Sequence, residues 1–239
     1  MSRDRRELEL PLAVDRTDPS VRLARQGRCR WLVGVDEAGR GPLAGPVAAA
    51  AVLLEVGRGE LPAVADSKAL THEARAALVP AIEAQAAAWA VALEDAQEID
   101  ALGIVGATMR AMARAVEQVL RGRAALATEV MVVVDGRETI PGLPWRQRAI
   151  IKADASCAVV AAASILAKER RDQVCAELEQ AHPGYGFADH KGYGTTTHLR
   201  ALMGLGPSPQ HRRSFDPLKT FVQTGEWPPG LRERLADAS

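Results

Sequence analysis

Residues 34–41 read Gly34-Val35-Asp36-Glu37-Ala38-Gly39-Arg40-Gly41, and they continue an apolar run that begins at Trp31. Two adjacent carboxylates therefore stand at the end of a short apolar segment, and a Gly-Arg-Gly turn follows at once. Paired carboxylates suit hard divalent cations, and glycines let the backbone approach a ligand closely. The stretch predicts a strand that ends at a metal or ligand site.

Other interpretations of this octapeptide compete with a metal site. Gly34 and Gly39 have the separation of a phosphate-binding loop, but Arg40 stands at the lysine position and the two acids would repel phosphate. The glycine spacing does not fit a dinucleotide-binding fingerprint either. A strand followed by a solvated acidic turn remains open on these residues alone, so the rest of the chain must decide.

Composition indicates one substantial hydrophobic core, because 47% of the 239 residues are hydrophobic. The 30 basic and 30 acidic side chains cancel, so net charge does not point to a nucleic-acid partner. It does not exclude one either, since a local basic groove suffices for phosphate contacts.

The cysteines and the N-terminal segment indicate the cellular compartment. Cys29, Cys157 and Cys175 are odd in number and lack a paired metal-ligand spacing, which favours reduced thiols. Residues 1–28 are polar and rich in arginine, and we expect them to form a flexible arm. No stretch resembles a signal peptide or a membrane span, so we expect a cytoplasmic protein that does not associate with membranes.

Apolar runs and helical periodicity predict an α/β fold with a mixed sheet flanked by helices. Strands are expected over residues 31–36, 46–55, 86–93, 130–134 and 149–151. Helices are expected over residues 71–85, 99–120, 155–179 and 197–202. The small residues Ala161, Ala162, Ala163 and Ser164 would let the third of these helices pack closely against the sheet.

Three of the expected strands end in acids: Asp36 with Glu37, Asp135, and Asp154. If these ends converge, four carboxylates meet, and their mutual repulsion would raise their pKa values unless cations neutralise them. Ligands that offer only oxygen favour magnesium or manganese over zinc. Two such ions about 3.5–4 Å apart would suit the displacement of a phosphoryl oxygen.

Each acid also has a simpler explanation. Asp135 with Gly136 is a common turn dipeptide, and Asp154 could cap the helix that follows it. Asp36 and Glu37 are neighbours, so they face opposite sides of a regular strand unless the strand ends or bulges there. The joint pattern nevertheless favours a shared site.

Asp172 serves as a comparison, because it lies too far along a continuous helix from Asp154 to share that site. We expect it to form a structural ion pair with Arg170 or Arg171.

Further motifs follow these acids along the chain and carry a family resemblance. In order, they are Asp36-Glu37-Ala38-Gly39-Arg40-Gly41 with Gly45-Pro46, Asp66-Ser67-Lys68, Asp135-Gly136, Ala161-Ala162-Ala163-Ser164-Ile165 with Ala167-Lys168, and His190-Lys191-Gly192-Tyr193. This series resembles ribonuclease HII, the type 2 ribonuclease H, over roughly residues 30–220. Ala153 stands where that family more often has glycine, and Gly194 where proline is common.

The resemblance implies a ribonuclease H-like catalytic domain over residues 29–180 and a helical and loop extension over residues 181–239 that contributes to substrate binding. It implies that the metal-binding catalytic carboxylates are Asp36, Glu37, Asp135 and Asp154. It also implies that the junction between a ribonucleotide and a deoxyribonucleotide is read by Gly39, Arg40, Gly41 and Tyr193. Lys68, in a loop after Asp66 and Ser67, would suit a phosphate contact, and a solvated loop lysine is the alternative there. The Arg212-Arg213 pair beside His211 would grip the duplex backbone.

The implied activity is hydrolysis of the RNA strand of RNA/DNA hybrids and cleavage on the 5′ side of single ribonucleotides in duplex DNA. It would use two Mg²⁺ or Mn²⁺ ions, leave 3′-hydroxyl and 5′-phosphate ends, and be carried out by a monomer. Another two-metal nuclease of this fold, such as a resolvase or a transposase-like enzyme, is the nearest alternative. A non-catalytic module that binds hybrid duplexes is a second, although it would gain nothing from presenting acids to phosphates.

Overall fold

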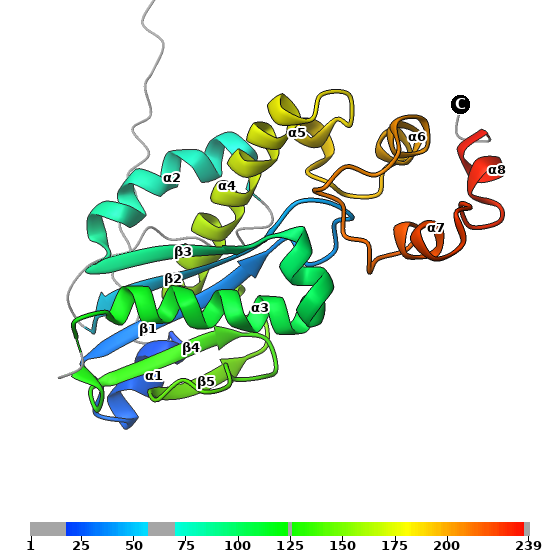
Figure 1. Cartoon of the computed structure of the whole chain (residues 1–239). Coiled ribbons are helices and arrows are strands. Elements are labelled where there is room, and N and C mark those ends of the chain that lie inside the picture. Colours follow the sequence, from blue (N-terminus) through cyan, green and yellow to red (C-terminus); the bar gives the residue numbers. More distant parts are fainter. Residues whose placement is uncertain (1–17, 57–69, 124–125, 237–239) are drawn as a thin grey trace, which may run out of the picture.

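The computed structural model describes residues 18–56, 70–123 and 126–236, and a five-stranded mixed sheet forms its centre (Figure 1). The strands are β1 (Trp31–Ala38), β2 (Val47–Glu55), β3 (Ala88–Glu94), β4 (Val130–Asp135) and β5 (Arg146–Ile150). Their order is β3-β2-β1-β4-β5. β2 is antiparallel to both of its neighbours, whereas β1, β4 and β5 run parallel. The predicted mixed α/β sheet is confirmed.

The central strands are apolar because helices cover both faces of the sheet. α4 (Ala158–Ala181) packs on one face with α1 (Pro19–Gln26) and α2 (His72–Gln85), and α3 (Ala96–Leu120) covers the other face (Figure 1). Along β1 the side chains alternate, so Leu32 faces α4 while Val33 and Val35 face α3.

Close packing of α4 on β1 explains the small residues at this contact. A Cβ atom on Gly34 would lie 2.3 Å from the carbonyl oxygen of Val159, which belongs to the backbone of α4. The cluster of small residues at positions 161–164 is buried against the same face. The prediction of a closely packed helix at this place is confirmed, and Gly34 is the strand's contribution to it.

Several elements differ from their predicted bounds, among them α4, which begins at Ala158 and not at residue 155, and for β5 and α3 the reason is identifiable. β5 is an edge strand whose first three residues, Arg146, Gln147 and Arg148, are polar, so an apolar run reveals only its end. α3 begins earlier than predicted, at Ala96, because Asp95 caps it through a hydrogen bond from the Glu98 amide. The helix is broken at Gly103, whose φ of 70° and ψ of 159° are not helical.

The expected flexible arm is wrong for the part of it that the structure describes. Residues 19–26 form α1, and Val21 and Ala24 are buried against the sheet. Asp18 caps this helix by accepting from the Ser20 amide, and its other oxygen accepts from the Ala158 amide at the start of α4, at 2.9 Å. The N-terminal segment is therefore part of the fold from Asp18 onward, and residues 1–17 lie outside the described residues.

The C-terminal region extends from the end of α4 as short helices joined by loops, at the right of Figure 1. These helices are α5 (Phe187–His190), α6 (Thr196–Leu205), α7 (Leu218–Thr224) and α8 (Leu231–Ala236). The predicted short helix over residues 197–202 is confirmed within α6. Backbone hydrogen bonds join this region to the loop after β1: Leu43 donates to Gly192, and Arg212 donates to Leu43, each at 2.8 Å.

All three cysteines are buried free thiols, which agrees with the predicted reduced state. None of the helices in the described part of the chain combines the length and the apolar composition that crossing a membrane requires.

Candidate metal centre and nucleic-acid contact loop

Asp36, Asp135 and Asp154 meet at one end of the sheet. Each offers a carboxylate oxygen, and these oxygens lie within 4.8 Å of one another. β1 and β4 are parallel neighbours with Val35 opposite Val134, so the next residues of the two strands stand side by side. Both aspartates then point to the face that α4 covers, because side chains alternate along a strand. The prediction that these three acids lie close together is confirmed.

Asp154 reaches the cluster from a turn and not from a strand end. β5 stops at Ile150, and Asp154 lies in a 3₁₀ turn over Ala153–Ala155. The Ala153 amide donates to Oδ1 of Asp135 at 2.7 Å, which ties this turn to the end of β4. Asp154 does not cap α4, since the first amide of that helix bonds to Asp18 instead.

Glu37 is placed differently from the other three acids. β1 continues in regular register to Ala38, so Asp36 and Glu37 face opposite sides of the sheet. The bulge or strand end that would turn both to one side is not there. Glu37 forms an ion pair of 3.3 Å with Arg40.

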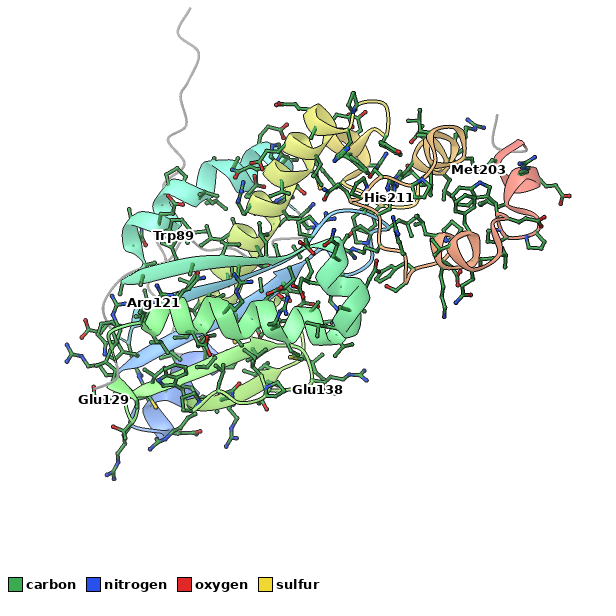
Figure 2. All side chains as sticks on the ribbon, in the orientation of Figure 1. Trp89, Arg121, Glu129, Glu138, Met203 and His211 are labelled. Atoms are coloured by element: carbon green, nitrogen blue, oxygen red, sulfur yellow. The ribbon has the colours of Figure 1, made fainter. Side chains whose placement is uncertain are left out.

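A cavity of about 360 Å³ is shared by Glu37 and one of the clustered acids, Asp135. Glu37, Asp135 and Glu138 line it together with residues of α3, and Figure 2 shows Glu138 at this end of the sheet. Asp135 therefore belongs both to this cavity and to the tight cluster, whereas Glu37 lines the cavity but is not part of the cluster.

Burial makes the charge of Asp36 costly. The residue is 3% exposed, and burial, with the neighbouring charges of Glu37 and Asp135, raises the pKa of its carboxyl to about 8. A hydrogen bond from the hydroxyl of Ser164 on α4 acts in the opposite direction and favours the charged form. A buried acid held among other acids is stable as an anion only when a positive charge is close.

The donor set fits a hard divalent cation. Three carboxylates in contact supply only oxygen, which is the ligand chemistry of magnesium and manganese. No histidine or cysteine belongs to this cluster within the residues that the structure describes, so nothing there favours zinc. Asp36, Asp135 and Asp154 are the residues that could hold such an ion, and Glu37 borders the site.

Gly39, Arg40 and Gly41 follow the acids almost directly; Gly39 is half-buried, and Arg40 and Gly41 form an exposed bend. Gly39 has a φ of +91°, and a Cβ atom there would lie 1.9 Å from Nε of Arg171, so only glycine fits. The ring of Tyr193, which is 47% exposed, lies beside Gly41: a Cβ atom on Gly41 would be 3.7 Å from its Cε1. The structure thus brings together the predicted loop residues and the predicted tyrosine.

Two buried histidines support the backbone at Tyr193. Nδ1 of His198 lies 2.9 Å from the Tyr193 carbonyl oxygen, which can only accept, so this nitrogen donates. Nε2 of His198 then accepts from Nε2 of His211 at 3.1 Å, and Nδ1 of His211 accepts from the Ser208 amide at 3.0 Å. Figure 2 shows His211 at the start of the C-terminal region.

These hydrogen bonds are complete only when both rings are neutral. Burial is the main cause that lowers the pKa of His198 to about 4 and that of His211 to about 3.

Arg212 does not face solvent, so its predicted grip on a duplex is wrong. It is fully buried and donates to the carbonyl oxygens of Gly39, Arg40 and Gly45. Burial, with the nearby charge of Arg171, lowers the pKa of its guanidinium to about 9. Arg213 is exposed, and its contact with a duplex stays a prediction.

Asp172 forms structural ion pairs, as predicted, but the predicted partners are wrong. It forms ion pairs with Lys168 at 2.6 Å and with Arg75 of α2 at 3.4 Å, not with Arg170 or Arg171. Arg75 also bonds Glu169 at 2.9 Å, so this network joins α2 to α4. Lys68, with Asp66 and Ser67, lies outside the described residues.

Sequence reasoning missed the supporting roles of Ser164 and Arg171. They are seven positions apart on α4, which places them on the same side of the helix. Ala161 and Ala167, on the same side, are buried as well. A hydroxyl and an arginine on a buried helix face were the available signal, because polar groups are kept in such places only when they have partners.

Comparisons with known proteins agree with this arrangement. The profile of the family described as Ribonuclease HII matches residues 33–218. The chain is 49% identical over 198 residues to a "Ribonuclease HII" of Laribacter hongkongensis, which covers 82% of this chain and 96% of that protein.

Solved structures share the fold at lower identity. The ribonuclease H2 of Pyrococcus horikoshii OT3 has a TM-score of 0.62 and 24% identity, covering 86% of this chain and 99% of the other. Bst-RNase HIII in complex with Mn²⁺ has a TM-score of 0.61 and 21% identity, covering 87% of this chain and 74% of the other.

Proposed function

Because the chain belongs to the ribonuclease HII family, we propose that it cuts duplex DNA on the 5′ side of single embedded ribonucleotides as well as the RNA strand of RNA/DNA hybrids. The enzyme is a ribonuclease H-type nuclease, and RNA/DNA hybrids are the substrate class of its family. The cut would leave 3′-hydroxyl and 5′-phosphate ends. The observation that carries the proposal is the cluster of Asp36, Asp135 and Asp154 beside the Gly39–Gly41 loop.

The carboxylates of Asp36, Asp135 and Asp154 would hold two divalent ions, Mg²⁺ or Mn²⁺, with Glu37 at the border of the site. Bound there, such ions would lower the pKa of a water molecule and would offset the charge on the departing 3′ oxygen. Support comes from the fold neighbour solved in complex with Mn²⁺ and from the oxygen-only donor set. The hydroxyl of Ser164 keeps Asp36 oriented and favours its charged form.

The loop and the tyrosine would recognise the ribonucleotide. A protein distinguishes RNA from DNA at one position by contacting the 2′-hydroxyl. Arg40 and Gly41 are exposed and Gly41 carries no side chain of its own, so a sugar can approach the backbone there beside the Tyr193 ring. Tyr193 would stack on the neighbouring sugar, and the Arg40 guanidinium would contact a phosphate.

A cleavage assay tests this function directly. End-labelled duplex DNA with one ribonucleotide is incubated with the protein and Mg²⁺ or Mn²⁺, beside an all-DNA duplex and an EDTA control. We expect metal-dependent cutting only on the 5′ side of the ribonucleotide. Cutting of the all-DNA duplex would instead indicate a resolvase-like nuclease, and binding without cutting would indicate a hybrid-binding module.

A further inference from the structure

Two buried arginines contact the loop that follows β1, over residues 39–45, and one of them also contacts the segment before Tyr193. Arg171 is 1% exposed and Arg212 is 0% exposed. Neither has a carboxylate within ion-pair distance among residues 18–56, 70–123 and 126–236. Their charges are solvated by backbone carbonyl oxygens, and these carbonyls belong to the loop after β1 and to the segment before Tyr193. A buried charge is costly unless its donors are satisfied. The stability of both arginines therefore depends on the positions of these carbonyls, and the arginines in turn restrict how the carbonyls can turn.

Arg212 donates hydrogen bonds to the buried side of the loop after β1. Its Nη2 donates to the Gly39 carbonyl oxygen at 2.6 Å and its Nη1 donates to the Arg40 carbonyl oxygen at 2.9 Å. Its Nε and Nη2 also reach the Gly45 carbonyl oxygen, at 3.0 and 2.9 Å. The planar fork of one guanidinium thus spans both ends of the loop.

Arg171 joins this loop to the tyrosine. It donates to the carbonyl oxygens of Pro46 at 3.1 Å and of Lys191 at 2.9 Å. Its side chain fills the space where a Cβ atom of Gly39 would stand. Its guanidinium carbon also lies 6.0 Å from the centre of the Tyr193 ring. The Arg171 side chain therefore lies against both the Gly39–Gly41 loop and Tyr193, the two parts of the proposed ribonucleotide contact.

The direction of the Gly39 and Arg40 carbonyls determines which backbone groups of the loop are accessible to a ligand. In a trans peptide the C=O of one residue and the N–H of the next point in opposite directions, and the bonds here are trans. Because the carbonyls of Gly39 and Arg40 point to Arg212, the amides of Arg40 and Gly41 point away from it. Both residues are exposed, and within the described part of the chain neither amide donates a hydrogen bond.

We propose that Arg212 and Arg171 are positioning residues that fix the loop with the amides of Arg40 and Gly41 turned outward, as two donors for an acceptor oxygen. This inference rests on the proposed function, in which that oxygen is the 2′-hydroxyl oxygen of the ribonucleotide. Without the two arginines the peptide planes are free to rotate, and a peptide plane that turns its carbonyl outward no longer presents its amide as a donor to that oxygen. By fixing the loop, the two arginines increase the preference of the protein for binding a ribonucleotide over a deoxyribonucleotide.

The test measures that choice as a ratio of dissociation constants. Binding of a duplex with one ribonucleotide and of the all-DNA duplex is measured in an Asp135→Asn background, which prevents cutting. The ratio is unaffected by any inactive fraction, because both constants scale with it. We expect Arg212→Met to reduce the ratio at least about tenfold, and Arg171→Met to reduce it in the same direction.

A matched control and a conservative variant complete the design. Arg170→Met removes the neighbouring arginine on α4, which pairs with Glu177 at the surface, and should leave the ratio unchanged. Arg212→Lys keeps the charge, but a single ammonium cannot span three carbonyls, so the ratio should again fall. This variant decides the question if Arg212→Met does not fold.

The outcomes separate the two proposals. A ratio in Arg212→Lys and Arg171→Met that equals the ratio of the Asp135→Asn parent would overturn the positioning role, while the proposed function would stand. Failure of the unmodified protein to cut at the ribonucleotide would instead overturn the proposed function.

Discussion

The backbone amide of Ala153 donates a hydrogen bond of 2.7 Å to Oδ1 of Asp135. This bond holds the turn that carries Asp154 against the end of β4, so one acid of the cluster fixes the position of another. An asparagine at position 135 can still accept this bond, whereas an alanine cannot. The two substitutions therefore separate the structural role of Asp135 from its charge.

We expect Asp135→Asn to abolish turnover, because it removes a negative charge from the proposed metal site, while duplex binding and the melting temperature stay close to those of the parent. Asp135→Ala should also lower the free energy of unfolding by about 1–3 kcal/mol, since a buried amide loses its acceptor. Cleavage of the ribonucleotide-containing duplex, electrophoretic binding and urea unfolding measure these three properties. Near-normal turnover in Asp135→Asn would remove this residue from the mechanism.

Divalent ions should stabilise the folded protein through the same acids. A ligand present at about 100 times its dissociation constant stabilises the native state by about 2.7 kcal/mol. We therefore expect Mg²⁺ or Mn²⁺ to raise the melting temperature by about 5 °C or more relative to EDTA. Asp36→Asn should lose most of this shift, whereas Asp189→Asn, outside the cluster, should keep it. An equal shift in both variants would place the ion elsewhere.

Acid should destabilise the fold through His198 and His211. Their folded-state pKa values, about 4 and about 3, lie below the ordinary value of 6.5, so the unfolded chain binds more protons between these limits. Their stabilising contribution is complete above about pH 6.5 and falls by up to about 1.4 kcal/mol per histidine for each pH unit below it. Urea unfolding at pH 5, 6 and 7 measures the slope. His198→Phe should flatten that slope, and an unchanged slope would contradict this assignment.

Glycine substitutions should have opposite effects at two positions. Gly34→Ala brings a Cβ atom to within 2.3 Å of the α4 backbone, which cannot move without shifting the helix, so we expect a loss of about 3 kcal/mol or more. Gly204→Ala, on α6 with no atom within 4 Å of the added Cβ, should stabilise the protein by about 0.5–1 kcal/mol. Thermal unfolding of both variants measures the contrast. Tolerance of alanine at position 34 would mean that α4 packs less closely than described.

The sequence predicted the strands, and the positions of Asp36 and Asp135 near the ends of two of them, because burial on two faces produces continuous apolar runs. It could not predict β5 fully, since an edge strand with Arg146 and Arg148 carries no such run. The orientation of Glu37 depends on whether β1 continues past Asp36, and the pairing of Ala38 with Ala48 decides that. Local sequence holds no information on that pairing.

The roles of Asp18 and Arg212 were missed for a related reason. Each acts on a segment far away in the chain, at Ala158 and at Gly39 respectively. Seen alone, the first belongs to a polar terminal stretch and the second to a basic dipeptide. Only the fold shows that both are buried and bonded to backbone atoms, so tertiary structure overrides their composition.

The three clustered acids come from chain positions 36, 135 and 154, and the two strands that carry Asp36 and Asp135, β1 and β4, pair in parallel. Parallel pairing joins distant residues and is completed late in folding. During synthesis, the chain therefore has no complete cluster until residues beyond Asp154 have left the ribosome and the sheet has closed. A nascent or misfolded chain would thus be unable to cut nucleic acid, and nuclease activity would appear only with the finished fold.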